Sequence, residues 1–203
     1  MRRLEYDFYN RHDVVAIARE LLGKILVSYV DGVKTSGRIV ETEAYAGITD
    51  KASHAYNGRR TNRTEVMFGE PGKAYVYLCY GIHHLFNIVT NVKGIPHAVL
   101  IRALEPIEGV QHMLARTKKS KADHTLTRGP GNVTRALGLD RTHTGVNLLS
   151  EELYVMDDDF VIAPEDVVVS PRIGVDYAAE DALLLYRFNV RGNPYVTKTK
   201  KSL

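Results

Sequence analysis

The feature that most constrains the fold is the dipeptide Asp31-Gly32, which follows a run of residues with alternating character. In that run Ile25, Val27 and Tyr29 alternate with Leu26, Ser28 and Val30. Asp-Gly is favoured in the two-residue turns that join antiparallel strands. The chain is therefore expected to contain an antiparallel sheet, and the return strand leads directly into the segment Ile39 to Tyr45.

The size of the chain favours one folded unit. It has 203 residues, of which 44% are hydrophobic, so it can bury one substantial core. No apolar run approaches the roughly 18 residues of a membrane span, and the N-terminal sequence lacks the apolar core of a signal peptide. We expect one domain over residues 1–203, cytoplasmic and without a membrane partner.

Turn signals and periodicity indicate further elements along the chain. A helix is expected from Val14, capped by Asp13 and ended by Gly23. The other expected elements are strands over 75–79, 85–89 and 98–104, helices over 106–116 and from about 132 to 138, and short strands within LYVM, DVVVS and LLLYRFNV. This order, with hairpins first and helices interspersed, favours an α+β domain with a largely antiparallel sheet.

Two carboxylates share one face of the strand from Ile39 to Tyr45. Because side chains alternate along a strand, Glu41 and Glu43 lie on the same face, about 7 Å apart. Arg102 interrupts a buried-looking strand and needs a partner there. A glutamate kept ionised by an arginine can deprotonate a water. On composition alone, a purely structural ion pair is the more common explanation for these residues, and the spacing does not choose between the two glutamates.

A second group offers ring surfaces for stacking. Tyr45, Tyr77 and Tyr80 accompany His54 in the sequence, and a base stacked on an aromatic side chain gains about 1–3 kcal/mol. Tyr80 precedes Gly81 at a break between two strands, so it is expected at or near a hairpin tip. Tyr75 is expected in the core. Together with the glutamates, these rings suggest an enzyme that acts on a base or nucleotide.

Basic residues occur in clusters, although the net charge of +3 is modest. One cluster, in the long loop that holds His54, comprises Arg59, Arg60 and Arg63; lysines at 118, 119 and 121 and at 198, 200 and 201 form two more. Gly131 and Asn132 open the short helix that ends near 138, where backbone N–H groups can bind an anion, although a plain turn with a helix cap explains these residues equally well. These features permit a polyanionic partner, while a solvated surface explains the lysine clusters equally well.

Metal and cofactor motifs are missing from the sequence. Cys79 is the only cysteine, which excludes an internal disulfide and a Cys-x-x-Cys zinc site. No His-Glu-x-x-His, phosphate-loop or dinucleotide fingerprint occurs. From the residues alone three hypotheses stay open: a DNA glycosylase, a metal-dependent nuclease using Glu41, Glu43 and Asp50, and a non-catalytic RNA-binding module that presents its tyrosines on a sheet.

Five segments resemble one known family in the same order and over nearly the whole chain. They are RIVETEAY, YVYLCYGIHHLFN, VLIRALEP, RGPGNVTRALGL and YRFNVRGNPYV. The sequence resembles the alkyladenine (3-methyladenine) DNA glycosylases of the mammalian type. The resemblance implies a single mixed domain with a curved antiparallel sheet. It also implies a monofunctional enzyme that needs no cofactor and removes alkylated or deaminated purines from double-stranded DNA. We expect a monomer.

The resemblance also implies roles for individual residues. Glu43 matches the general base that activates a water, Arg102 matches an arginine that holds this water, and the Ile173 carbonyl matches the group that completes its site. The remaining matches are Tyr45, His54 and Tyr77, which enclose the flipped base, Asn87, which screens it, and Tyr80, which fills the gap left in the duplex. We further expect Arg59, Arg63, Gly131 and Asn132 to contact DNA.

Overall fold

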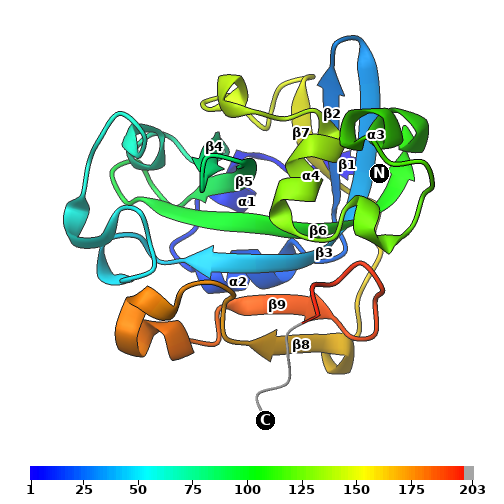
Figure 1. Ribbon diagram of the computed structural model, residues 1–203. Helices are drawn as coiled ribbons and strands as arrows, with labels where there is room; N and C mark the ends of the chain where they lie inside the picture. The colour runs from blue at the N-terminus through cyan, green and yellow to red at the C-terminus, as the bar shows by residue number, and fades with distance from the viewer. Residues whose placement is uncertain (199–203) are drawn as a thin grey trace.

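The central element of the computed structural model is β3 (Val33–Tyr45), a long strand in an antiparallel sheet (Figure 1). The structure describes residues 1–198, so Lys200 and Lys201 lie outside it. The other strands in this part are β1 (Arg2–Arg3), β2 (Ile25–Val30), β4 (Ala74–Cys79), β5 (His83–Thr90), β6 (His97–Glu108), β7 (Leu153–Asp157), β8 (Val167–Ser170) and β9 (Arg187–Val190). Their order is β1-β7-β2-β3-β6-β5-β4, and β9 joins β3 to β8. All pairings between these strands are antiparallel, as the sequence predicted.

The predicted turn at Asp31-Gly32 is confirmed. Val30 pairs with Val33, and both turn residues have positive φ angles, of 55° and 74°. The first half of β3 pairs with β2, whereas residues 41–43 pair with β9 on the same side. β6 accompanies β3 along its other side. The end of β3 that carries the two glutamates therefore lies between strands from distant parts of the chain.

An irregularity between β3 and β6 shapes the region around Arg102. Ile39 pairs with Leu104, Glu41 with Ala103 and Thr42 with Ile101, so Val40 and Arg102 have no directly opposed partner. Such bulges redirect side chains and are frequent beside active sites. Here the bulge coincides with the arginine that contacts both glutamates.

Helices cover both faces of the sheet. α2 (Val14–Glu20) begins at Asp13, whose side chain accepts hydrogen bonds from two backbone N–H groups, which confirms the predicted cap. α1 (Tyr6–Tyr9) and α2 lie behind the sheet in Figure 1, while α3 (Val110–Thr117) and α4 (Pro130–Leu137) lie in front. Short 3₁₀ segments occur at Gly47–Thr49, Tyr56–Gly58, Glu65–Phe68, His124–Leu126, Arg141–His143, Pro164–Asp166 and Asp176–Leu183. The α+β class and the single domain are confirmed.

The predicted helix over 106–116 is wrong at its start. β6 continues to Glu108, and the helix begins only at Val110. Pro106 pairs with Gly37 next to a second register shift, and proline is tolerated in strands at such bulges. Gly109, with a φ of 76°, then turns the chain into α3. The last predicted strand is also shorter than LLLYRFNV, because a 3₁₀ segment occupies the chain up to Leu183.

In residues 1–198, no helix is both long enough and apolar enough to cross a membrane.

Candidate active site

A cavity of about 860 Å³ opens beside the end of β3. Its walls come from the loop after β3, the β4–β5 hairpin, part of β6, the start of α4 and the segment after β8. The predicted site residues that line it are Tyr45, His54, Arg59, Arg63, Tyr77, Tyr80, Asn87, Arg102, Gly131, Asn132 and Ile173. Its volume lies within the usual range for ligand sites. The structure thus brings together residues that are up to 128 positions apart, from Tyr45 to Ile173.

Glu43 lies directly behind this cavity and is fully buried. Its Oε2 accepts hydrogen bonds from the Tyr45 hydroxyl at 2.9 Å and from Arg102 Nη1 at 3.1 Å. Its Oε1 accepts one from the backbone N–H of Ile173 at 2.8 Å. This contact uses the Ile173 N–H, while the carbonyl that the resemblance assigns to the water is a separate atom and its role stays a prediction. The carboxylate is held from three sides by groups that also line the cavity.

Arg102 bridges the two glutamates. Besides its contact with Glu43, its Nε donates to Glu41 Oε1 at 3.0 Å. Burial opposes the charge on this guanidinium, but the two carboxylates outweigh it and raise the pKa of Arg102 above its ordinary value. The sequence left open which glutamate pairs with the arginine, and the structure shows that both do.

Glu41 has further donors that the sequence did not predict. Arg187 Nε donates to Glu41 Oε1 at 2.7 Å, and the Thr197 N–H donates to its Oε2 at 2.8 Å. Arg187 lies on β9, inside the quoted segment YRFNVRGNPYV. A charged residue between the apolar Tyr186 and Phe188 was the available signal. We call the residues Glu41, Glu43, Arg102 and Arg187 the charged floor of the site.

A second buried ion pair supports the floor. Arg172 donates to both oxygens of Asp50, at 2.5 and 2.8 Å, and to the Ala44 carbonyl at 2.9 Å. Its guanidinium also lies 4.8 Å from the centre of the Tyr45 ring. The pair thereby joins the segment that carries Ile173 to the end of β3. Sequence analysis missed this role for Arg172.

Tyr45 stays protonated at ordinary pH. Its pKa is raised well above the usual value, first because the ring is buried and then because Glu43 is adjacent. The hydroxyl can therefore donate to the Glu43 carboxylate, as the 2.9 Å contact requires.

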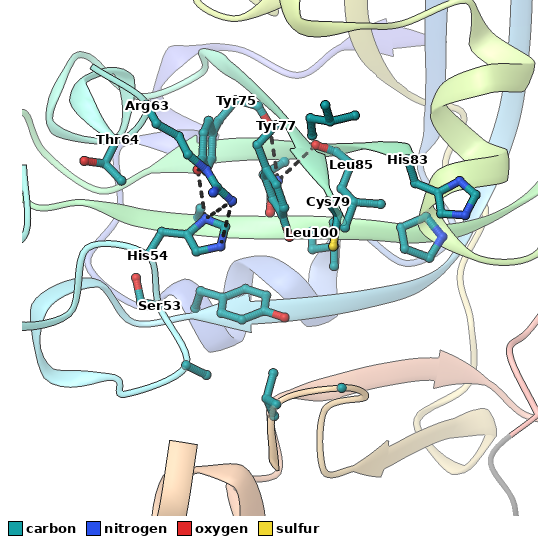
Figure 2. Close-up of a pocket in the computed structure, with 18 of the residues that line it drawn as sticks. Ser53, His54, Arg63, Thr64, Tyr75, Tyr77, Cys79, His83, Leu85 and Leu100 are labelled. Atoms are coloured by element: carbon teal, nitrogen blue, oxygen red, sulfur yellow. Dashed lines mark hydrogen bonds between the residues drawn. The ribbon is translucent and has the colours of Figure 1, made fainter. Parts of the chain in front are cut away.

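One wall of the cavity is aromatic and is formed by His54, Tyr75 and Tyr77 (Figure 2). His54 meets the Tyr77 ring edge-on, with ring centres 4.5 Å apart. Its Nδ1 lies 2.8 Å from the Tyr75 hydroxyl, and Arg63 Nη2 lies 3.1 Å from its Nε2. Because arginine can only donate, Nε2 accepts and Nδ1 carries the proton. Tyr75 is buried, as predicted, and its hydroxyl also orients His54.

His54 is uncharged near neutral pH. Its pKa is lowered to about 4, mainly by burial and further by the positive charges of Arg63 and Arg59. Asn87, also buried, donates from Nδ2 to the Tyr75 carbonyl at 3.2 Å and to the Leu85 carbonyl at 3.4 Å. Its side chain is therefore fixed against the β4–β5 hairpin.

Tyr80 stands at the mouth of the cavity, in the turn between β4 and β5. The hairpin tip predicted for it is confirmed. Its side chain is 88% exposed and its φ is 50°, in the left-handed region. The neighbouring Ile82 is also exposed. The hairpin thus presents an aromatic ring to the outside, directly beside the cavity.

The start of α4 packs against this hairpin. A Cβ atom on Gly131 would lie 2.9 Å from the His83 ring, so only glycine fits without movement. Asn132 Nδ2 donates to the Arg128 carbonyl at 2.8 Å and to the Thr125 carbonyl at 3.2 Å. The two predicted DNA contacts therefore also have structural roles in the free protein.

The arrangement disfavours the nuclease hypothesis. Within residues 1–198, no group of three or more His, Cys, Asp or Glu side chains is arranged to hold a metal ion. Glu41 and Glu43 are bonded to arginine on the floor, and Asp50 is bonded to Arg172. These carboxylates are thus engaged with guanidinium groups.

Comparison with known proteins identifies the family. The family described as "Methylpurine-DNA glycosylase (MPG)" matches residues 7–194. A relative from Clostridium perfringens (strain 13 / Type A) is 46% identical over 97% of this chain and 99% of its own length. One from Bacillus mycoides is 49% identical over 92% of this chain and 95% of its own. Both carry the name "Putative 3-methyladenine DNA glycosylase". The non-catalytic hypothesis is therefore wrong, and the chain belongs to the methylpurine-DNA glycosylase family, hydrolases that cleave N-glycosidic bonds in DNA repair.

Proposed function

We propose that this enzyme removes alkylated or deaminated purines, of the 3-methyladenine, 7-methylguanine and hypoxanthine types, from double-stranded DNA. The damaged nucleotide is flipped into the cavity, and a water activated by Glu43 hydrolyses the N-glycosidic bond, which leaves an abasic site. The observation that carries the proposal is the Glu43 carboxylate held behind an aromatic cavity that has an exposed tyrosine at its mouth.

One acceptor position of the Glu43 carboxylate is not used by the donors in residues 1–198 and can bind a water. An ionised carboxylate offers about four acceptor positions, and the contacts with Tyr45, Arg102 and Ile173 use three of them. The remaining position is on Oε1. A water there can give a proton to Glu43 as it attacks C1′, with Arg102 and the backbone of Ile173 orienting it. Because no lysine is part of this set, simple hydrolysis without strand cleavage is expected.

The cavity walls suit a flipped purine. Extruding a nucleotide costs a few kcal/mol, least at a damaged or mispaired base. Tyr45, His54 and Tyr77 all line the cavity and offer stacking worth about 1–3 kcal/mol per base. Asn87, fixed against the hairpin, screens out normal guanine by its exocyclic amine. Tyr80 enters the duplex and fills the space that the base has left.

The outer parts of the site are proposed to hold the DNA strand. Arg59 and Arg63 line the cavity on the loop side, and Gly131 and Asn132 lie at the start of α4 on the other side. Arginine side chains and helix N-termini are common ligands of phosphate groups. One protein chain provides both sides, so we propose that a monomer is active.

The test measures abasic-site formation in duplexes that carry hypoxanthine, 3-methyladenine or 7-methylguanine. Glu43→Gln is expected to lower the single-turnover rate at least 100-fold, which is the lower end of general-base contributions. Glu65→Gln, which changes an exposed glutamate outside the cavity, should retain the native rate. EDTA should have no effect.

Three outcomes would contradict the proposal. Absence of base release by the native protein from all three duplexes would exclude the proposed activity. A loss below tenfold in a folded Glu43→Gln variant would move the general base to Glu41. Direct strand cleavage abolished by EDTA would instead indicate a metal-dependent nuclease.

A further inference from the structure

The lining of the cavity carries positive charge that is not balanced on its own surface. Its charged residues are Lys51, Arg59, Arg63 and Arg102, and no aspartate or glutamate of residues 1–198 belongs to the lining. Glu41 and Glu43 lie behind it, where they already contact Arg102 and Arg187. Arg102 is thus matched, and Lys51 pairs with Glu180 at 2.5 Å. Among residues 1–198, the lining charges without an ion pair are therefore those of Arg59 and Arg63.

Arg63 places part of this charge on the aromatic wall. Its guanidinium carbon lies 4.7 Å from the centre of the Tyr77 ring, its Nε donates to the Tyr75 hydroxyl at 3.3 Å, and its Nη2 donates to His54. Figure 2 shows the guanidinium between these three side chains. Its partners are all uncharged, and none of the ion pairs formed by residues 1–198 includes it. Its charge therefore acts on whatever enters the cavity.

The nature of the lesion decides whether this charge helps or opposes binding. Purines alkylated at N3 or N7 carry a delocalised positive charge while attached to the sugar, whereas hypoxanthine is neutral. An aromatic ring attracts a cation through its face, but Arg63 already occupies such a position on Tyr77. Arg63 is exposed in the free protein, so solvent screens its charge in part, but like charges a few ångströms apart still repel. A neutral oxopurine instead brings O6 and N7, acceptors that a guanidinium can serve.

We propose that Arg63 is a specificity-determining residue, which biases the cavity toward uncharged deaminated purines such as hypoxanthine and against cationic N-alkylpurines. The inference rests on the proposed glycosylase function and adds a preference among its substrates. His54 reinforces the effect by geometry, because its Nε2 accepts from Arg63 and so helps to hold the guanidinium at the wall.

The experiment compares kcat/KM for excision of 7-methylguanine and of hypoxanthine from the same duplex sequence. The measured quantity is the ratio of the cationic to the neutral substrate, so differences in intrinsic reactivity cancel between variants. Arg63→Gln removes the charge and keeps hydrogen-bonding capacity, and it is expected to raise the ratio at least tenfold. Arg63→Lys keeps the charge and should leave the ratio within about threefold of native.

Arg60→Gln is the matched control. Arg60 belongs to the same loop, but it pairs with Glu65 at 2.6 Å and does not line the cavity. This variant should keep the native ratio. Arg63→Met, a second uncharged variant, should reproduce the result of Arg63→Gln, so that one poorly folded protein does not decide the test.

The possible failures separate clearly. If the native enzyme excises both bases and neither uncharged variant changes the ratio, the inference is overturned while the glycosylase function stands. A ratio that rises equally with Arg63→Lys would assign the effect to shape instead of charge and would also overturn it. If the native enzyme excises neither base, the proposed function itself fails.

Discussion

The charged floor and the mouth of the cavity differ in how their polar groups are satisfied. On the floor, Glu41 and Glu43 are fully buried, Arg102 and Arg187 are at most 6% exposed, and each charge has an opposite charge in contact. These residues come from β3, β6 and β9. At the mouth, Tyr80 and Ile82 project from a turn, and the exposed Arg59 lies on a loop and forms no ion pair within residues 1–198. The charges of the floor are therefore already paired within the free protein, whereas the side chains at the mouth are exposed to solvent.

The difference has an energetic basis. A buried charge is tolerated only with a partner, and breaking such a pair commonly costs 3–5 kcal/mol. An exposed side chain away from the core contributes about 0.5 kcal/mol or less to stability. Substitutions on the floor should therefore affect folding and catalysis together. Those at the mouth should affect DNA recognition alone.

The largest effect is expected for Arg102→Met. The change leaves Glu43 without an arginine and Glu41 with Arg187 alone, so the free energy of unfolding should fall by about 3–5 kcal/mol. Urea denaturation followed by circular dichroism measures this quantity. Arg3→Met is the control, because Arg3 pairs with the exposed Glu151 and should cost about 1 kcal/mol or less. If the free energy of unfolding falls equally in the two variants, the buried ion pairs of the floor stabilise the protein no more than an exposed pair does.

The next effect concerns the mouth. Tyr80→Ala should leave the free energy of unfolding within about 0.5 kcal/mol of native, while excision from duplex DNA falls about 5- to 150-fold, the equivalent of 1–3 kcal/mol of stacking. Alanine is chosen over glycine because glycine would relax the strained φ of 50° and stabilise the turn by itself. Single-turnover excision and thermal unfolding provide the two measurements.

Tyr29→Ala is the matched control for this variant. Tyr29 is also an exposed tyrosine near a hairpin turn, but it lies on β2 and not at the cavity. Excision should stay at the native rate. The prediction for the mouth would be contradicted if Tyr80→Ala is less stable to thermal unfolding than Tyr29→Ala, or if it excises the base at the native rate.

Local features of the fold could be predicted from the sequence because their causes are local. The turn at Asp31-Gly32, the cap at Asp13 and the position of Tyr80 each depend on a few adjacent residues. The start of α3 was misplaced for the opposite reason. Pro106 is compatible with a first helical turn, but its pairing with Gly37 across the sheet keeps it in β6.

The site could be predicted only in part. Strand alternation grouped Glu41 with Glu43, and the resemblance was needed to choose Glu43 as the general base, a choice that stays a prediction. The ion pairs of Arg172 with Asp50 and of Arg187 with Glu41 join residues 122 and 146 positions apart. They exist because β9 pairs with β3 and the segment after β8 folds over its end. No local pattern in the sequence specifies that pairing.

The smallest effect is expected for Arg59→Gln. This variant tests whether the Arg59 guanidinium, at the mouth of the cavity, binds a DNA phosphate. Affinity for undamaged duplex DNA should fall with salt, and replacing one phosphate-binding arginine should reduce the slope of log K against log salt concentration by about 0.9. Stability should not change. Arg60→Gln should keep the native slope, because Glu65 already engages that side chain. If Arg59→Gln and Arg60→Gln reduce the slope equally, an ion pair within the free protein does not determine which arginines are available to DNA. The floor and the mouth would then differ in their effect on catalysis but not in how their charges are used for DNA binding.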